Sequence, residues 1–301
     1  MLTLSRILSS VPLSWALWMG HVLGGIWYWL IPIRRGVALQ NIERALGDSL
    51  TPRERRRVIR RCFDMQVMAT IELLRAGHYT PEQSQRYIHA RGMEHIDAAL
   101  EQGAGVIVVA SHTGNVDLMG YSQSILGYPV CVIVKELRWG PVQRYVRAVR
   151  ERTGVGLIPA RNSKEQIRRT IADNKVMCMI VDQHMKKHRA IVCKFFGRLA
   201  STSPAPARFA LEAGTPVVTA VMMRRGNTGH FDFRVEPFEM ETPHADTDAN
   251  IRHNTQRLND VIEGWTREDP SQWLWLHKRW KVDDNPEGWD IPDGLRAPAR
   301  Q

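Results

Sequence analysis

A histidine and an aspartate five residues apart could act as a general base with an orienting acid. Residues 110–117 read ASHTGNVD and directly follow an apolar run at 105–109. This run is rich in β-branched residues and predicts a buried strand of a parallel sheet, at whose end α/β proteins place their chemistry. Gly114 and Asn115 tolerate unusual backbone angles, so the Asp117 carboxylate can hold one nitrogen of His112 while the other nitrogen takes a proton from a hydroxyl. A strand-end histidine and a helix-start aspartate with purely structural roles are the competing interpretation.

The chain from about residue 90 alternates between strand and helix patterns. The strand-like runs lie at 105–110, 130–134, 155–158, 176–181, 216–221 and 231–235. The helical patterns lie at 93–102, 116–125, 141–152, 163–173, 204–213 and 249–266. This alternation predicts an α/β fold with a predominantly parallel, mixed sheet flanked by helices. We expect one catalytic domain over residues 34–282 and a flexible tail over 283–301.

Residues 1–33 form a hydrophobic N-terminal segment. Val11 to Ile33 is a stretch of 23 residues without Asp, Glu, Lys or Arg, and it carries four tryptophans. The length and the aromatic content predict a membrane anchor that either spans a bilayer or lies in its interface, with a buried hairpin of a soluble protein as the alternative. Arg34, Arg35 and Arg44 follow the segment and only Arg6 precedes it, which places the rest of the chain on the cytoplasmic face of the inner membrane.

A basic helical lead-in is predicted over residues 51–77, with Thr51 as cap and Pro52 at the first helical position. Its first half is rich in arginine, and the whole chain has a net charge of +10. An anionic partner such as lipid headgroups or an acidic carrier protein, or simply a solvated arginine face, would account for this charge. We found no nucleic-acid-binding motif, so no nucleic-acid partner is predicted. The four cysteines show no C-x-x-C pairing and are expected to be reduced.

The motif around His112 resembles the catalytic motif of the glycerolipid and lysophospholipid acyltransferase superfamily, and more narrowly that of the lipid A biosynthesis acyltransferases, the late lauroyl and myristoyl transferases. The resemblance continues through further blocks in the same order along nearly the whole chain. These blocks are Asp182-Gln183, Phe195-Phe196-Gly197, Ala200-Ser201-Thr202-Ser203, the run from Gly214 to Arg224, and QWLWLHKRWK at 272–281.

The resemblance implies acyl transfer from a carrier-bound thioester to a hydroxyl of a membrane lipid, with no metal or redox cofactor. His112 would be the general base and Asp117 would orient it, without an acyl-enzyme intermediate. The expected partners are an acyl-carrier protein or acyl-CoA as donor, a membrane lipid as acceptor, and the bilayer itself. Residues expected to bind substrate near such a site are Asn115, Arg161, Asp182, Gln183, Thr202 and Arg224, although each could equally be a structural pair or a cap.

Other chemistries find less support. Asp182, His184, His188 and Cys193 crowd one segment, but two lysines lie among them and the His-Glu-x-x-His pattern is absent, so a polar loop is favoured over a metal site. The sequence has no Gly-x-Ser-x-Gly nucleophile elbow, so a serine hydrolase is disfavoured. The tryptophans at 273, 275 and 280 are either a membrane-interface belt or, as we favour, core residues.

The sequence also departs from the lipid A group. Asp117 stands where that group tends to have Glu, and Val116 stands where it tends to have an aromatic residue. Residues 134–138 lack the Tyr-Arg-Pro motif of the group. Asp and Glu can play the same orienting role, so the chemistry is unaffected but the acceptor is open. A phosphatidylinositol-mannoside or other glycolipid acyltransferase fits the same residues. The alternative to an enzyme is a non-catalytic module of the same fold that binds the membrane or a carrier protein.

Overall fold

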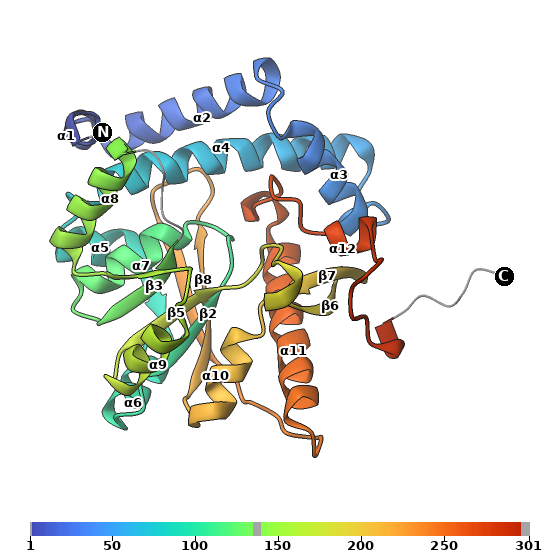
Figure 1. The fold of residues 1–301 in the computed structure, drawn as a ribbon. Helices are drawn as coiled ribbons and strands as arrows, with labels where there is room; N and C mark the ends of the chain where they lie inside the picture. Colours follow the sequence, from blue (N-terminus) through green and yellow to red (C-terminus); the bar gives the residue numbers. More distant parts are fainter. Residues whose placement is uncertain (1, 135–139, 296–301) are drawn as a thin grey trace.

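A seven-stranded mixed sheet forms the centre of the protein (Figure 1), in a computed structural model that describes residues 2–134 and 140–295. The strand order is β1-β9-β8-β2-β5-β3-β4, and every neighbouring pair is parallel except β8 with β9. The strands are β1 (Ile88–Arg91), β2 (Val106–Ala110), β3 (Val130–Val134), β4 (Gly156–Pro159), β5 (Val176–Ile180), β8 (Val217–Arg224) and β9 (Phe231–Pro237). The predicted α/β fold with a predominantly parallel, mixed sheet is confirmed.

Helices cover both faces of the sheet because alternate residues of each central strand point to opposite sides. Val106, Val108 and Ala110 of β2 belong to one core, whereas Ile107 and Val109 belong to the other. The first core is completed by α6 (Glu94–Glu101), α7 (Val116–Ile125) and α8 (Gly140–Thr153). The second core is completed by α9 (Lys164–Ala172), α10 (Ala205–Ala213) and α11 (Thr247–Glu268).

Two β features had not been predicted. Strand β1 is short and exposes three of its four residues, so it carries no apolar pattern. The hairpin of β6 (Ile191–Phe195) and β7 (Arg198–Thr202) turns at Phe196 and Gly197, both with positive φ (52° and 70°). A Phe-Gly turn lacks the Asn-Gly or Asp-Gly sequence that makes such hairpins recognisable. The helix predicted from residue 204 begins one residue later: α10 starts at Ala205, without a side-chain cap on its N-cap residue.

The N-terminal helices lie over one end of the sheet (Figure 1). They are α1 (Leu2–Ser10), α2 (Leu13–Leu30), α3 (Arg35–Leu46) and α4 (Pro52–Ala76), and α5 (Pro81–Tyr87) follows. A capping box between Thr51 and Glu54 starts α4 where the sequence predicted a helix start. Among the described residues, each helix taken alone is too short or too polar to cross a bilayer; only α1 and α2 together have the required length and composition, and they meet at a bend of 120°.

The segment after residue 270 packs against the domain. Trp273, Trp275 and Trp280 are almost completely buried in the second core, so the membrane-belt interpretation of these rings is wrong. Helix α12 (Lys281–Asp284) follows them, and two short 3₁₀ turns lie at Pro270–Gln272 and Asp293–Leu295. Within the segment predicted to be flexible, Asp283 accepts a hydrogen bond from the Leu199 amide at 3.3 Å, and Ile291 packs with Val282. Residues 135–138, part of the segment that lacks the Tyr-Arg-Pro sequence of the lipid A group, lie outside the described residues.

Candidate active site

The loop that carries His112 is clamped between two other segments. The Gly114 amide donates to the Gln272 carbonyl at 3.0 Å, and the Asn115 amide donates to the Met222 carbonyl of β8 at 3.2 Å. The carbonyl of His112 accepts from the Leu274 amide at 3.0 Å. Gly114 has φ +67°, and a Cβ there would lie 1.8 Å from the Met222 carbonyl oxygen, so no other residue fits. These contacts fix the backbone of the loop, and so the point from which the His112 ring projects.

Asp182 holds the ring of His112. It follows β5, which pairs with β2, so the two strands end side by side. One carboxylate oxygen lies 2.7 Å from His112 Nδ1, and the other accepts the His112 amide and the Trp273 indole N–H, each at 2.9 Å. Three N–H donors therefore surround one buried carboxylate and fix its orientation.

The charge state of Asp182 follows from these donors. Burial by itself would raise the pKa of this carboxyl, but the charge of His112 and the hydrogen bonds from it outweigh burial and hold the pKa below its usual range. An ionised Asp182 accepts hydrogen bonds only, so Nδ1 of His112 carries the proton and Nε2 presents its lone pair. The Gln183 amide lies 3.1 Å from Nε2 and can donate to that lone pair. The ring is thus held in the tautomer that a base acting through Nε2 requires.

Asp117 lies in the first turn of α7, as predicted. It is exposed to solvent, yet the protein around it raises the pKa of its carboxyl through desolvation, an effect that the nearby charge of His112 partly opposes. The hydrogen bond to Nδ1 is made by Asp182, so the orienting role expected for Asp117 stays a prediction and Asp117 acts on His112 as a nearby charge.

Asn115 and Arg224 meet at a third residue that the sequence analysis had not singled out, Glu72 of α4. The Asn115 amide donates to Glu72 at 2.7 Å, and its oxygen caps α7 by accepting from the Leu118 amide at 3.1 Å. Arg224 forms a bidentate ion pair with Glu72, one arm of it at 2.6 Å. All three side chains are buried and support the loop that carries His112, and the substrate-binding roles expected for Asn115 and Arg224 stay predictions. The sequence feature that could have identified Glu72 is its position as an acidic residue on the apolar face of α4.

Thr202 ends strand β7, and Arg161 comes after strand β4. Thr202 is fully buried and its hydroxyl accepts from Arg279 at 2.8 Å and from Asn259 at 3.0 Å, which is a structural arrangement. Arg161 follows the edge strand β4, which β3 and β5 separate from β2, and its side chain is exposed. The substrate-binding roles expected for both residues stay predictions. Arg279 was missed as a site residue; its buried guanidinium reaches the carbonyl of Gln183 and so supports the segment that touches His112.

The segment after Gln183 is a polar network. The His184 amide donates to His277 Nε2 at 2.9 Å, and His184 Nδ1 lies 2.7 Å from the Ser201 hydroxyl. Within residues 2–134 and 140–295, no group of three or more His, Cys, Asp or Glu side chains is arranged to hold a metal ion.

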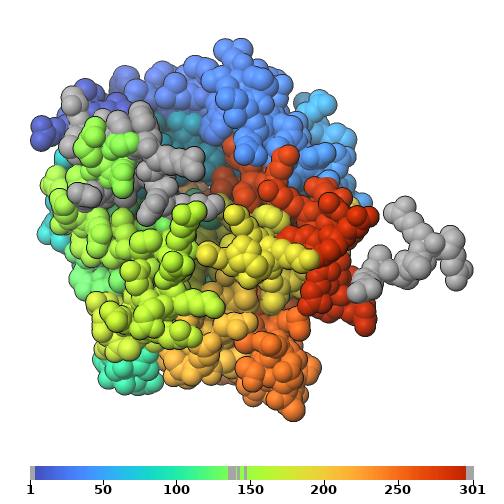
Figure 2. All heavy atoms as spheres, in the orientation of Figure 1, coloured from blue at the N-terminus to red at the C-terminus, as the bar shows by residue number. Residues whose placement is uncertain are grey.

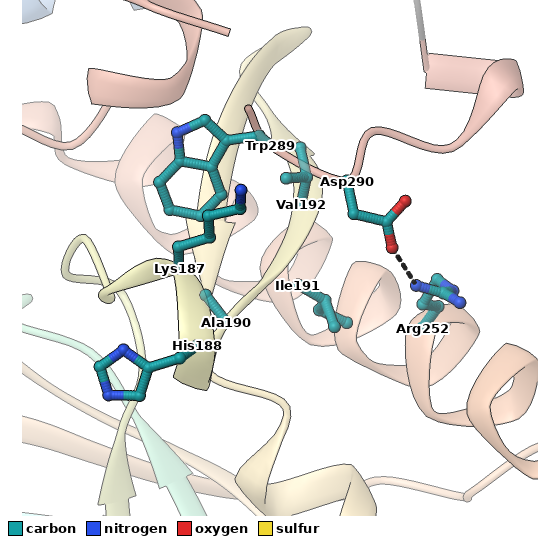
Figure 3. Close-up of a pocket in the computed structure, with 8 residues that line it drawn as sticks. All are labelled: Lys187, His188, Ala190, Ile191, Val192, Arg252, Trp289 and Asp290. Carbon is teal, nitrogen blue, oxygen red and sulfur yellow. Dashed lines mark ion pairs between the residues drawn. The ribbon is translucent and has the colours of Figure 1, made fainter. Parts of the chain in front are cut away.

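An open pocket of about 530 Å³ adjoins this network (Figure 3). The His184 ring meets the edge of the Trp289 indole at 5.9 Å, and Trp289 lines the pocket with Lys187, His188 and Arg252. Figure 2 shows one face of the molecule. On this face the N-terminal segment lies at the top, above the residues near 190 and the C-terminal segment.

Comparisons with known proteins find distant relatives in sequence. The phosphatidylinositol mannoside acyltransferase of Mycolicibacterium smegmatis is 24% identical over 199 residues, which cover 65% of this chain and 63% of that protein. The chain thus spans a little under two thirds of the length of the mycobacterial relatives that it matches.

Relatives from Escherichia coli K12 match over more of their length. The lipid A biosynthesis palmitoleoyltransferase is 22% identical over 298 residues, 90% of this chain and 92% of that protein. The lipid A biosynthesis lauroyltransferase is 22% identical over 272 residues, 90% of this chain and 86% of that protein.

A solved structure and a family model complete the comparison. The crystal structure of the 1-acyl-sn-glycerophosphate acyltransferase PlsC from Thermotoga maritima shows a distant likeness, with a TM-score of 0.40 and 13% identity over 86% of this chain and 99% of that one. The model of the bacterial lipid A biosynthesis acyltransferase family matches residues 1–282. The chain therefore belongs to the bacterial lipid A biosynthesis acyltransferase family.

Proposed function

We propose that this protein transfers a fatty acyl group from a thioester donor to a hydroxyl of a lipid A precursor or a related glycolipid. The observation that carries the proposal is the ring of His112, held through Nδ1 by Asp182 so that Nε2 presents a lone pair. A histidine in this state is a general base near neutral pH. Membership in the acyltransferase family supports acyl transfer as the reaction that this base serves.

The reaction proceeds by direct attack. As the acceptor oxygen bonds to the thioester carbonyl carbon, its proton passes to Nε2 of His112, and the Gln183 amide gives up its contact with that nitrogen. The tetrahedral adduct then breaks its carbon–sulfur bond, and the thiol leaves with the proton returned by the imidazolium. The amides of Val116 and Asp117, which come before the capped Leu118 amide in the first turn of α7, offer hydrogen bonds to the oxyanion. No metal or redox cofactor takes part.

The two carboxylates have different roles in this mechanism. Asp182 keeps the ring oriented and stabilises the imidazolium that forms when Nε2 takes the proton. Asp117 lies near enough for its charge to interact with that of His112, which favours the imidazolium further. Gln183 lies close enough to Nε2 to touch the substrate oxygen.

The bilayer and the donor complete the proposal. The apolar helices α1 and α2 attach the protein to the cytoplasmic face of the inner membrane, where the acceptor lipid lies. The donor is acyl-carrier protein or acyl-CoA, and the positive net charge of the chain suits either anionic donor. The two kinds of glycolipid acyltransferase among the relatives support a glycolipid acceptor.

The test is acyl transfer by the purified protein, with His112→Ala as the inactive variant and His188→Ala, an exposed histidine, as its matched control. Mass spectrometry of membrane lipids with and without the protein identifies the acceptor and the acyl chain together, because one acyl group adds one defined mass. We expect the His112 variant to lose product formation while it unfolds at an unchanged temperature. Full activity of this variant would refute the base assignment. Absence of product with every donor and glycolipid acceptor would instead favour a non-catalytic binding module.

A further inference from the structure

The N-terminal helices expose an unusual apolar surface. In the part of the chain that the structure describes, every exposed large hydrophobic side chain lies between residues 4 and 33. Five of them are spaced along one side of α2, at intervals of three or four residues: Trp15, Trp18, Val22, Ile26 and Trp29. This spacing places them on one face of the helix. The three tryptophans are 66%, 60% and 67% exposed. We call these five residues the apolar stripe.

The opposite face of α2 is built to fit protein. A Cβ at Gly24 would lie 2.5 Å from the Asp64 Cα of α4, and one at Gly20 would lie 2.8 Å from the Met68 side chain. The rings of Trp27 and Phe63 meet at 4.7 Å. Helix α2 therefore runs antiparallel along α4 at a distance that only glycine permits.

Polar contacts reinforce this packing. His21 of α2 lies 2.8 Å from the carboxylate of Asp64, whose buried side chain also pairs with Arg60. At the other end of α4, the Ser5 hydroxyl of α1 donates to the Leu74 carbonyl at 2.6 Å, and Arg75 donates to the Val11 carbonyl at 2.8 Å. Both N-terminal helices are thus fastened along a single partner helix.

This attachment is at odds with a bilayer span. Helix α2 has 18 residues, which at about 1.5 Å each give about 27 Å, slightly less than the roughly 30 Å of a hydrocarbon core. Helix α1 cannot extend it, because the two meet at a bend of 120°. If α2 left α4 to cross the membrane, Asp64 would lose its His21 partner and the glycine face would turn to lipid. Helix α2 is apolar on all sides, but one face is covered by α4 and the open face carries three tryptophans, which suits the interface between headgroups and acyl chains.

We propose that α1 and α2 lie in the plane of the bilayer, with the apolar stripe inserted into one leaflet and α4 packed on the side away from the lipid. The partner is a phospholipid surface. The inference rests on the membrane attachment proposed above and specifies its geometry. It also gives α4 two functions, because Gly24 and Gly20 pack on one side of it while Glu72 supports Asn115 and Arg224 beside the catalytic loop.

The first experiment measures binding to vesicles of phosphatidylethanolamine and phosphatidylglycerol by flotation. Replacing Trp15, Trp18 and Trp29 together by glutamine should weaken partitioning by about tenfold for each ring removed from the lipid. Trp289→Gln is the matched control, because this ring lines a pocket outside the stripe, and it should bind as the parent does. Unchanged binding of the triple variant would overturn the proposal.

A second experiment separates an in-plane helix from a span. Single cysteines are placed at Ser10 and Gly36, on either side of α2; Ser10 is exposed, and a Cβ at Gly36 meets no atom within 4 Å. The half-exposed Cys131 is replaced by serine, while the other three cysteines are buried. A membrane-impermeant maleimide should label both positions from the same side of reconstituted vesicles. Labelling from opposite sides would overturn the proposal. Acyl transfer to detergent-solubilised acceptor, measured on the same variants, reports on the catalytic proposal independently.

Discussion

Replacing Asp182 by asparagine should trap His112 in the wrong tautomer. One carboxylate oxygen of Asp182 accepts two hydrogen bonds, from the His112 amide and from the Trp273 indole, and the other lies 2.7 Å from His112 Nδ1. An asparagine has one acceptor oxygen, which will satisfy the two fixed N–H donors. Its NH₂ group then faces Nδ1, which must present a lone pair, and the ring proton moves to Nε2. The base thus loses the lone pair that takes the acceptor proton.

The size of the effect follows from this geometry. A catalytic histidine in the wrong tautomer that also lacks its carboxylate loses about 10³- to 10⁴-fold in kcat, which corresponds to about 4–5.5 kcal/mol of transition-state stabilisation. The fold should survive, because two of the three hydrogen bonds are kept, and a destabilisation of about 1–3 kcal/mol is expected from the lost charge-assisted bond.

The assay is the rate of acyl transfer under saturating substrate, together with nitrogen-15 NMR of labelled histidine, which reports the ring tautomer directly. Asp173→Asn is the matched control, since this aspartate is exposed and lies 3.4 Å from the Lys175 ammonium. Thermal unfolding checks that the Asp182 variant is folded. A folded Asp182→Asn protein whose kcat lies within about tenfold of the parent would refute the reasoning, because a misplaced proton on Nε2 is incompatible with that rate.

Three further predictions concern the supports of the site. Gly114→Ala should abolish acyl transfer, because the added Cβ would lie 1.8 Å from the Met222 carbonyl oxygen of β8. An active variant whose crystal structure shows no backbone shift would contradict the tight fit of the His112 loop. Glu72→Gln should lower kcat with little change in KM, because buried Arg224 loses its charge partner and the loop that carries His112 loosens. A rise in KM with unchanged kcat would instead indicate that Arg224 binds substrate. Burial lowers the pKa of His277 from 6.5 to about 4; the charge of Asp182 opposes this shift and that of Arg279 adds to it. Because the folded-state pKa lies below the unfolded one, this group contributes stability above pH 6.5 that is lost as the pH falls toward 4, by at most about 3 kcal/mol. His277→Gln should flatten that part of a pH series of denaturant unfolding, and an unchanged slope would assign the loss to other groups.

Local patterns were sufficient for most of the fold. The alternation of apolar runs and helical periodicities predicted six of the seven strands that the described residues contribute to the main sheet, and the helices between them, because burial on both faces requires continuous apolar residues in a parallel strand. Thr51-Pro52 predicted the start of α4, since capping depends on neighbouring residues alone. Strand β1 escaped because its pairing partner, β9, lies more than a hundred residues away and its own residues are mostly exposed.

The proposed base, His112, could also be selected from the sequence, as a polar residue directly after a buried strand with glycine and asparagine behind it. Its partners were decided by the tertiary structure. Asp182 lies 70 residues from His112 along the chain and reaches it because β5 pairs with β2, a choice of strand order that no local pattern encodes. The same holds for Glu72 and Trp273, which come from a helix and a closing segment that meet only when the domain is folded. Residue types and periodicity are local properties, whereas the position of a proton on His112 depends on side chains that only folding brings within hydrogen-bond distance.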